Sequence, residues 1–128
     1  MYFFNTMSNR GGGINPYYSA LYDSWTNQPG ADLKAAQNEQ IALMASRSYW
    51  AKFDAVWFPG FVSVNDDGEA TKNVINPGAN DLTEVNSPYF NMFSGYKGDA
   101  ATKYLNLNWN LATHGVKAKY NDQSLIAY

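Results

Sequence analysis

Residues 32–60 read DLKAAQNEQIALMASRSYWAKFDAVWFPG, and this stretch divides the chain into two parts. Its first half is rich in strong helix formers, and Asp32 is the expected N-cap. Five side chains are expected near one face of this helix: Leu33, Ala36, Gln40, Ile41 and Met44. Further along, Trp50, Phe53 and Trp57 recur at helical spacing. We interpret these three rings as a continuation of the helical face that packs in the core, with a ligand platform as the alternative.

The segment before this stretch predicts a second helix. Pro16 suits the first helical turn, and Tyr17, Leu21 and Trp25 follow at intervals of four residues. Pro29-Gly30 forces a turn between the two helices. Two helices in an antiparallel hairpin are therefore expected within residues 16–60.

Beyond Pro59-Gly60 the pattern changes to short strands and turns. We expect strands at Glu84 to Met92, Lys103 to Trp109 and Leu125 to Tyr128. In the second of these, apolar Tyr104, Leu105, Leu107 and Trp109 oppose polar Asn106, Asn108 and Asn110. Asn65-Asp66-Asp67-Gly68 predicts an ordinary turn. It fails as an EF-hand loop because Val74 stands where the bidentate Glu belongs, although a looser calcium site is an alternative.

The predicted fold class is α+β, a helical hairpin at the N-terminal side followed by short antiparallel β-strands. The expected organisation is an arm at 1–15, a helical segment at 16–60 and a β-rich segment at 61–128. The arm carries Gly11-Gly12-Gly13, so we expect it to be ordered by docking on a neighbour or to be a frayed terminus.

The composition favours a protein that meets a partner. Of the 128 residues, 16% are aromatic and 16% are charged, while about 25% charged is ordinary. Large rings with a polar tip suit interfaces because they bury much area with little loss of side-chain entropy. The net charge of −2 and the lack of a basic stripe argue against a nucleic-acid partner. The longest apolar stretch, Ala55 to Val62, is far too short to span a membrane.

Residues for enzyme chemistry are sparse. The chain has no cysteine and one histidine, His114, which we place in a solvated loop. Zinc therefore lacks its usual ligands. The carboxylate pair Asp81 and Glu84 has nothing in the sequence to place it in a desolvated cleft, which acid–base catalysis needs. We expect no enzyme activity and no cofactor.

Six segments in order resemble a recurrent virion protein of phages and prophages. In that family a short helical stretch leads into a concanavalin A-like (LamG-type) β-sandwich. The matching segments are Leu21 to Trp25, Trp50 to Trp57, Asn73 to Gly78, Val85 to Phe90, Gly95 to Asp99 and Lys103 to Leu105, with Gln123 to Leu125 at the start of a further strand.

This resemblance implies that the β-rich segment is a partial, apparently truncated jelly-roll or sandwich. It also implies a structural component of a bacteriophage virion, associated with tail or head. Leu125 to Tyr128 is strand-like, and an open edge there needs cover from another strand. The expected partners are therefore copies of the same chain and other virion proteins.

Two alternatives differ in class from this structural role. One is a carbohydrate-binding module for host-surface adhesion. Its sugar-stacking or interface aromatics would be Tyr89, Tyr96, Tyr104 and Trp109, with hydrogen bonds from Asn106, Asn108 and Asn110. The other is a hydrolase of cell-envelope sugars, for which the chain lacks a readable pair of catalytic carboxylates.

Overall fold

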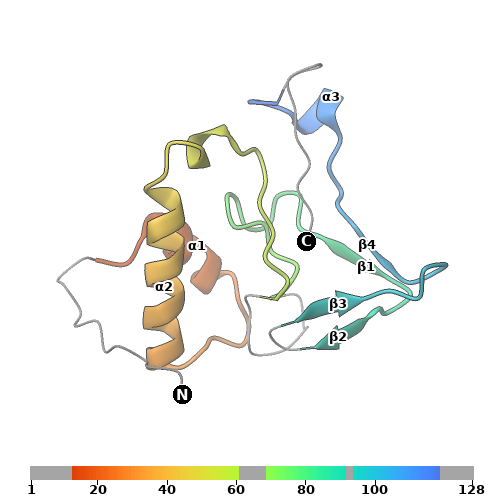
Figure 1. Ribbon diagram of the computed structural model, residues 1–128, viewed down its shortest axis with the longest axis horizontal. Coiled ribbons are helices and arrows are strands. Elements are labelled where there is room, and N and C mark those ends of the chain that lie inside the picture. Colours follow the sequence, from red (N-terminus) through yellow and green to blue (C-terminus); the bar gives the residue numbers. More distant parts are fainter. Residues whose placement is uncertain (1–12, 61–68, 92–93, 119–128) are drawn as a thin grey trace.

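The structure is a computed structural model that describes residues 13–60, 69–91 and 94–118. It confirms an α+β fold with a helical region at the N-terminal side (Figure 1). The helices are α1 (Pro16–Asp23), α2 (Ala31–Ala45), the 3-10 helix η1 (Trp50–Lys52) and α3 (Leu111–His114). The strands are β1 (Thr83–Val85), β2 (Tyr89–Asn91), β3 (Gly95–Lys97) and β4 (Tyr104–Asn106).

The four strands form two separate antiparallel pairs. β1 pairs with β4, and the β2–β3 pair is inserted between them in the sequence. The pairs lie beside one another and extend away from the helices (Figure 1). Short antiparallel strands are confirmed, whereas their membership of a jelly-roll or sandwich stays a prediction. The strand expected at Leu125 to Tyr128 lies outside the described residues, as do most of the arm and the turn at 65–68.

Helix α1 begins where Pro16 predicts. The Asn15 side chain caps it by accepting a hydrogen bond from the N–H of Tyr17 at 3.0 Å. The face predicted for this helix is shifted by one residue at its start, because Tyr18 is completely buried while Tyr17 is half-buried. Trp25 is buried but lies beyond the helix, which ends at Asp23.

Helix α2 differs in its cap and its buried face. Its N-cap is Gly30, so the prediction that Asp32 caps the helix is wrong. Asp32 instead lies in the first turn, where a negative charge is favoured by the helix dipole. Gln37 and Ile41 are the buried residues. Ala36 and Gln40, predicted on this face, are exposed, because each lies one position, about 100° of helical rotation, from that centre line.

The predicted helical continuation through Trp50, Phe53 and Trp57 is also wrong. Helix α2 ends at Ala45, and the Ser46 hydroxyl donates to the carbonyl of Leu43 at 2.7 Å, a local bond that competes with helix propagation. Trp50 nevertheless lies in the core as expected, edge-on to Phe53 with ring centroids 6.1 Å apart. Trp57 is paired in an isolated β-bridge with Asn73 instead.

The core lies between the helices and the segment that begins at residue 69. Its buried apolar members are Tyr18, Leu21, Trp25, Ile41, Trp50, Ala70 and Val74. The Tyr18 hydroxyl donates to Gln37 Oε1 at 2.9 Å, which links α1 to α2 inside this cluster. Phe90 and Tyr96 pack against it from the β2–β3 pair. The core therefore holds that strand pair against the helices by one face only.

Two of the predicted strands are shorter than expected. Glu84 to Met92 does not form one strand, because Asn86 and Ser87 adopt positive φ angles of 57° and 52° and divide it between two sheets. The segment from Lys103 leaves the strand after Asn106, since Asn108 also has a positive φ of 51°. These positive-φ residues interrupt strands that the alternating pattern alone would continue.

Candidate functional site

The four aromatic residues predicted as ligand or interface side chains do not share one surface. Tyr89 and Tyr104 are 64% and 54% exposed, on different sheets. Tyr96 is half-buried, its ring lies 4.9 Å from that of Phe90, and its hydroxyl donates to Glu84 Oε1 at 2.7 Å. Trp109 is half-buried. Tyr89 and Tyr104 are therefore the more accessible rings, and the role of the four residues in ligand binding or at an interface stays a prediction.

The asparagines proposed to bind sugar hydrogen-bond the chain itself. Asn108 Nδ2 donates to the carbonyl of Asp81 at 2.8 Å and to Thr83 Oγ1 at 2.6 Å. Asn106 Oδ1 accepts from the N–H of Asn108, and Asn110 caps α3 by accepting from the N–H of Ala112. These contacts fix the path of the chain as it leaves β4.

The segment Asn73 to Gly78, which carries part of the family resemblance, contains a hydrogen-bond network centred on Asn73. Buried Asn73 accepts from the N–H groups of Val56 and Ile75 through Oδ1, both at 3.1 Å. Its Nδ2 donates to the carbonyl of Ala79 at 2.9 Å, and its own N–H donates to Asp81 Oδ1 at 2.8 Å. The Asn73 amide side chain thus joins the segment at Val56 to the stretch from Asn73 to Ala79, a role that the sequence pattern did not reveal.

The remaining titratable candidates also have structural contacts. Asp81 forms an ion pair with Lys72 at 3.0 Å, while Glu84 accepts the Tyr96 hydroxyl. His114 ends helix α3 rather than lying in a loop, and its Nδ1 accepts from the N–H of Asn110 at 2.8 Å. Within the described ranges, no group of three or more His, Cys, Asp or Glu side chains could hold a metal ion.

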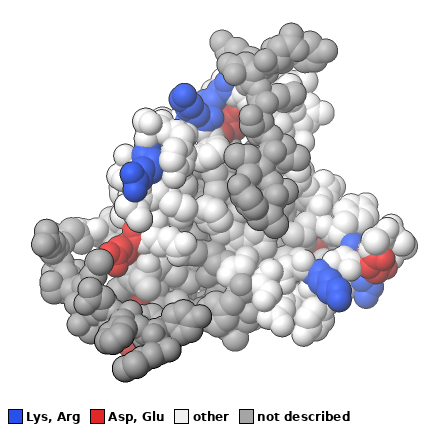
Figure 2. All heavy atoms as spheres, viewed as in Figure 1, with Lys and Arg blue, Asp and Glu red and all other residues white. Residues whose placement is uncertain are grey.

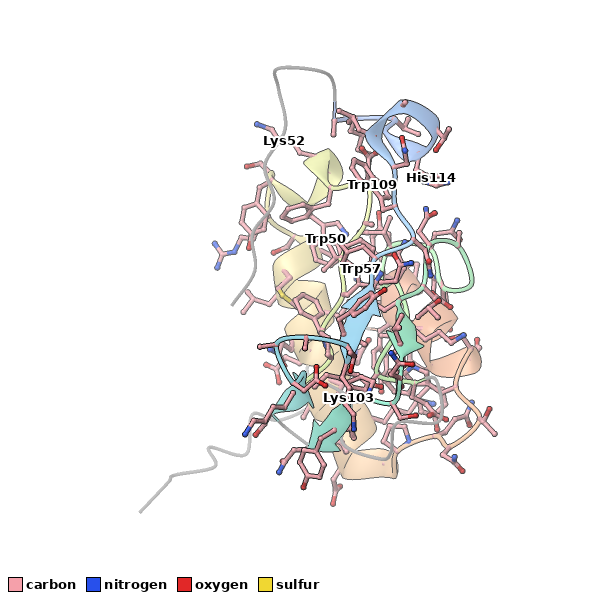
Figure 3. All side chains as sticks on the ribbon, turned by 90° about the vertical axis from the view of Figure 1, so that its right-hand side faces the viewer. Trp50, Lys52, Trp57, Lys103, Trp109 and His114 are labelled. Atoms are coloured by element: carbon pink, nitrogen blue, oxygen red, sulfur yellow. The ribbon has the colours of Figure 1, made fainter. Side chains whose placement is uncertain are left out.

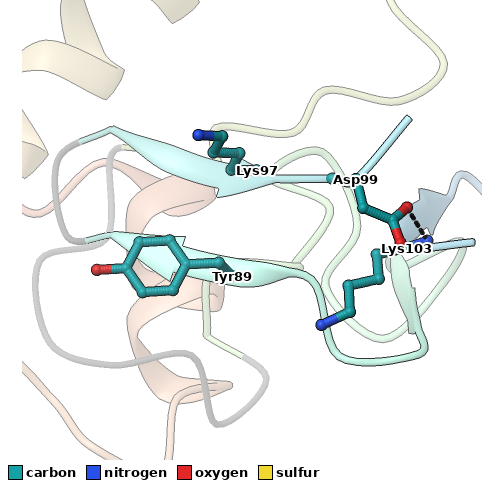
Figure 4. A pocket seen from close by; sticks show the side chains of 5 residues that line it. Tyr89, Lys97, Asp99 and Lys103 are labelled. Atoms are coloured by element: carbon teal, nitrogen blue, oxygen red, sulfur yellow. Dashed lines mark hydrogen bonds between the residues drawn. The ribbon is translucent and has the colours of Figure 1, made fainter. Parts of the chain in front are cut away.

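One open pocket of about 370 Å³ lies at the outer face of the β2–β3 pair. It is lined by Tyr89, Lys97, Gly98, Asp99 and Lys103. Figure 4 shows Tyr89 and Lys97 extending from adjacent strands, with Asp99 and Lys103 beyond the strand ends. Basic and acidic side chains lie together at the corresponding tip of the molecule (Figure 2). Of these residues only Tyr89 was predicted as a site residue.

The loop that closes the pocket is organised by Asp99. Its carboxylate accepts from the N–H groups of Lys103, Ala101 and Thr102 and from the Thr102 hydroxyl, at 2.7 to 3.0 Å. These bonds, that from the Lys103 N–H contributing most, hold the pKa of Asp99 far below its usual range. Gly98 is required here, because a Cβ on it would collide with the carbonyl oxygen of Lys103.

Comparison with known protein families, with curated proteins and with solved structures finds no match to this chain. The resemblance to phage virion proteins therefore stays a prediction. None of the helices in the part of the chain that the structure describes has the length and apolar character needed to cross a bilayer.

Proposed function

We propose that this chain is a non-enzymatic structural component of a bacteriophage virion, associated with tail or head, that assembles through aromatic-rich interfaces. The proposal is supported most by the unpaired strand edges of the two sheets. Among the described residues each strand has a single hydrogen-bonded partner, so each sheet has two open edges. Isolated two-stranded sheets are marginal in water, and open edges pair readily with other chains.

The exposed apolar side chains support the same proposal. Tyr104 is 54% exposed on β4, and Leu107 follows it, also exposed. Further large apolar side chains are exposed elsewhere: Ile14, Leu43, Tyr49, Tyr89 and Val116. Single exposed apolar residues are ordinary, but rings beside open strand edges are the chemistry that protein interfaces favour. Neighbouring copies or other virion proteins would cover both the edge and the rings.

The double variant Tyr104→Asp/Leu107→Asp tests assembly through this edge. It places two negative charges where the proposal expects an apolar contact between chains. Both side chains are exposed in the single chain, so the variant should still fold. Size-exclusion chromatography with light scattering should give an oligomer for the wild type and a smaller species for the variant. Val116→Asp is the control, since Val116 is 81% exposed and lies outside both sheets.

Circular dichroism shows whether the double variant retains its fold. A folded double variant with the same mass as the wild type would overturn assembly through β4. Equal disruption by Val116→Asp would also count against this edge as the interface.

A further inference from the structure

The geometry points to a binding site for an anionic saccharide in the pocket between Tyr89 and Lys103. The site lies on the outer face of the β2–β3 pair, whereas assembly is proposed through β4 of the other sheet, so the two functions use different residues.

The alternation of side chains along β2 and β3 separates an inner face from an outer one. Phe90 pairs with Tyr96 in the strand register, and both rings pack against the core. Tyr89 pairs with Lys97 in the same register. Successive side chains of a strand point to opposite faces, so Tyr89 and Lys97 are adjacent on the solvent side. The outer face therefore presents an aromatic ring beside an ammonium group (Figure 4).

The loop after β3 brings a second ammonium group to this face. The backbone of Lys103 is fixed by the bond from its N–H to Asp99 Oδ1 at 2.8 Å. Gly98 lies against the Lys103 carbonyl. The loop backbone that carries Asp99 and Lys103 is therefore fixed by hydrogen bonds, which limits the backbone ordering needed when a ligand binds.

The charges of the pocket select an anion. Within the described part of the chain, neither Lys97 nor Lys103 has an ion-pair partner. The one carboxylate that lines the pocket, Asp99, directs both oxygens to its own loop. The pocket lining thus contains two ammonium groups and a single carboxylate, which is already engaged. A carboxylate or phosphate group on a ligand would be attracted to them, and this attraction would weaken in salt.

The ring of Tyr89 selects a ligand with an apolar face. It is 64% exposed, so one side can stack on the C–H face of a sugar ring while the lysines bind the acidic substituent. A pocket of about 370 Å³ is at the small end of the range for ligand sites, in keeping with a short acidic sugar unit. A nucleic-acid backbone fits less well, because the chain has a net charge of −2 and no basic stripe.

Titration of the full chain, followed by NMR, with trigalacturonate, a glycerol phosphate trimer, neutral maltotriose and a short DNA duplex tests the site. We expect binding of trigalacturonate, weakened at high salt, and weaker binding of the glycerol phosphate trimer, which has no sugar ring to stack on Tyr89. Preference for maltotriose or for the glycerol phosphate trimer, equal binding of the DNA duplex, or no binding of trigalacturonate would overturn the inference.

Variants assign the binding to this pocket. Lys97→Gln and Lys103→Gln should each weaken binding by up to about fivefold, as for exposed ion pairs. Tyr89→Ala should weaken it further. The matched control is Lys52→Gln, since Lys52 is exposed and lies at a different end of the molecule from Lys103 (Figure 3). Binding that survives in the double lysine variant, or that Lys52→Gln weakens equally, would contradict the site. Neither result bears on assembly, which Tyr104 and Leu107 test.

Discussion

The carboxylate of Asp54 accepts a hydrogen bond from the backbone N–H of Lys117 at 2.9 Å, across 63 positions of sequence. It also accepts from the N–H of Ala118 at 2.8 Å, and Lys117 Nζ donates to the carbonyl of Phe53 at 2.6 Å. This contact joins the chain that follows α3 to the segment that follows η1. It thereby connects the last described residues to the helical part of the molecule.

Removing this carboxylate should loosen the chain after α3. Burial alone would raise the pKa of Asp54, but the hydrogen bonds from Ala118 and Lys117 outweigh it and lower the pKa. We expect Asp54→Ala to reduce the free energy of unfolding by about 1 kcal/mol at neutral pH. A group with a lowered folded pKa stabilises above its unfolded pKa, about 3.9, and this contribution disappears as pH falls through the folded value.

Urea denaturation of the wild type and Asp54→Ala between pH 7 and pH 2 measures this effect. The difference should be constant near neutrality and shrink below about pH 4. Glu39→Ala, on the exposed side of α2, is the control and should change little. A difference that grows as the pH falls would contradict the assigned contact.

Asn73 should be the most sensitive polar residue of the described core. Asn73→Ala leaves the N–H groups of Val56 and Ile75 and the carbonyl of Ala79 without this partner. Each such loss at a partly buried group costs roughly 1 kcal/mol, so we expect destabilisation of about 3 kcal/mol in urea denaturation. Asn76→Ala, at an exposed position three residues away, should lower stability by less than about 1 kcal/mol. Equal losses of stability in the two variants would contradict this hydrogen-bond network around Asn73.

Tyr18 should stabilise the fold in a way that ends at alkaline pH. Its burial, and secondarily the neighbouring Tyr22, raise the pKa of its hydroxyl well above the ordinary value. Stability from a raised pKa is fully present below the unfolded pKa, about 10, and is lost as pH rises beyond it. Above about pH 10 the wild type should therefore lose stability relative to Tyr18→Phe, which has no hydroxyl to ionise. Urea denaturation of both proteins between pH 7 and pH 11 measures this, with Tyr49→Phe, at a half-exposed position, as the matched variant.

Two substitutions in the loop after β3 should act in opposite directions. Ala100 has a positive φ of 63°, which a glycine adopts without steric cost, so Ala100→Gly should stabilise by a few tenths of a kcal/mol. Gly98→Ala should destabilise, since its Cβ would meet the Lys103 carbonyl. Thermal unfolding measures both. A neutral Gly98→Ala would mean that the loop does not close as described.

Local signals in the sequence predicted part of this fold. Pro16 marked the start of α1, and Pro29-Gly30 marked the break before α2, because both act through their own backbone. The burial of Trp50 was also predicted, although the helical spacing used to predict it is not present in the structure. The end of α2 was missed because the spacing of Trp50, Phe53 and Trp57 suggested that the helix continued past Ser46, whose hydroxyl bonds a carbonyl of the last turn.

The pocket could not be predicted because it depends on tertiary pairing. Tyr89 and Lys97 are adjacent only in the β2–β3 register, and Lys103 arrives through a loop organised by Asp99. A single strand from Glu84 to Met92 would have kept Tyr89 in the same sheet as Glu84, away from the separate β2–β3 pair. Its division rests on positive φ angles at Asn86 and Ser87, and the residue types alone permit either conformation.

Native mass spectrometry of the wild-type chain, over a range of concentrations, tests the proposed structural role most directly. The proposal predicts a homo-oligomer of defined copy number, in which neighbouring chains cover the open edges of the two sheets. A folded monomer that persists at the highest concentration would contradict assembly through copies of the same chain.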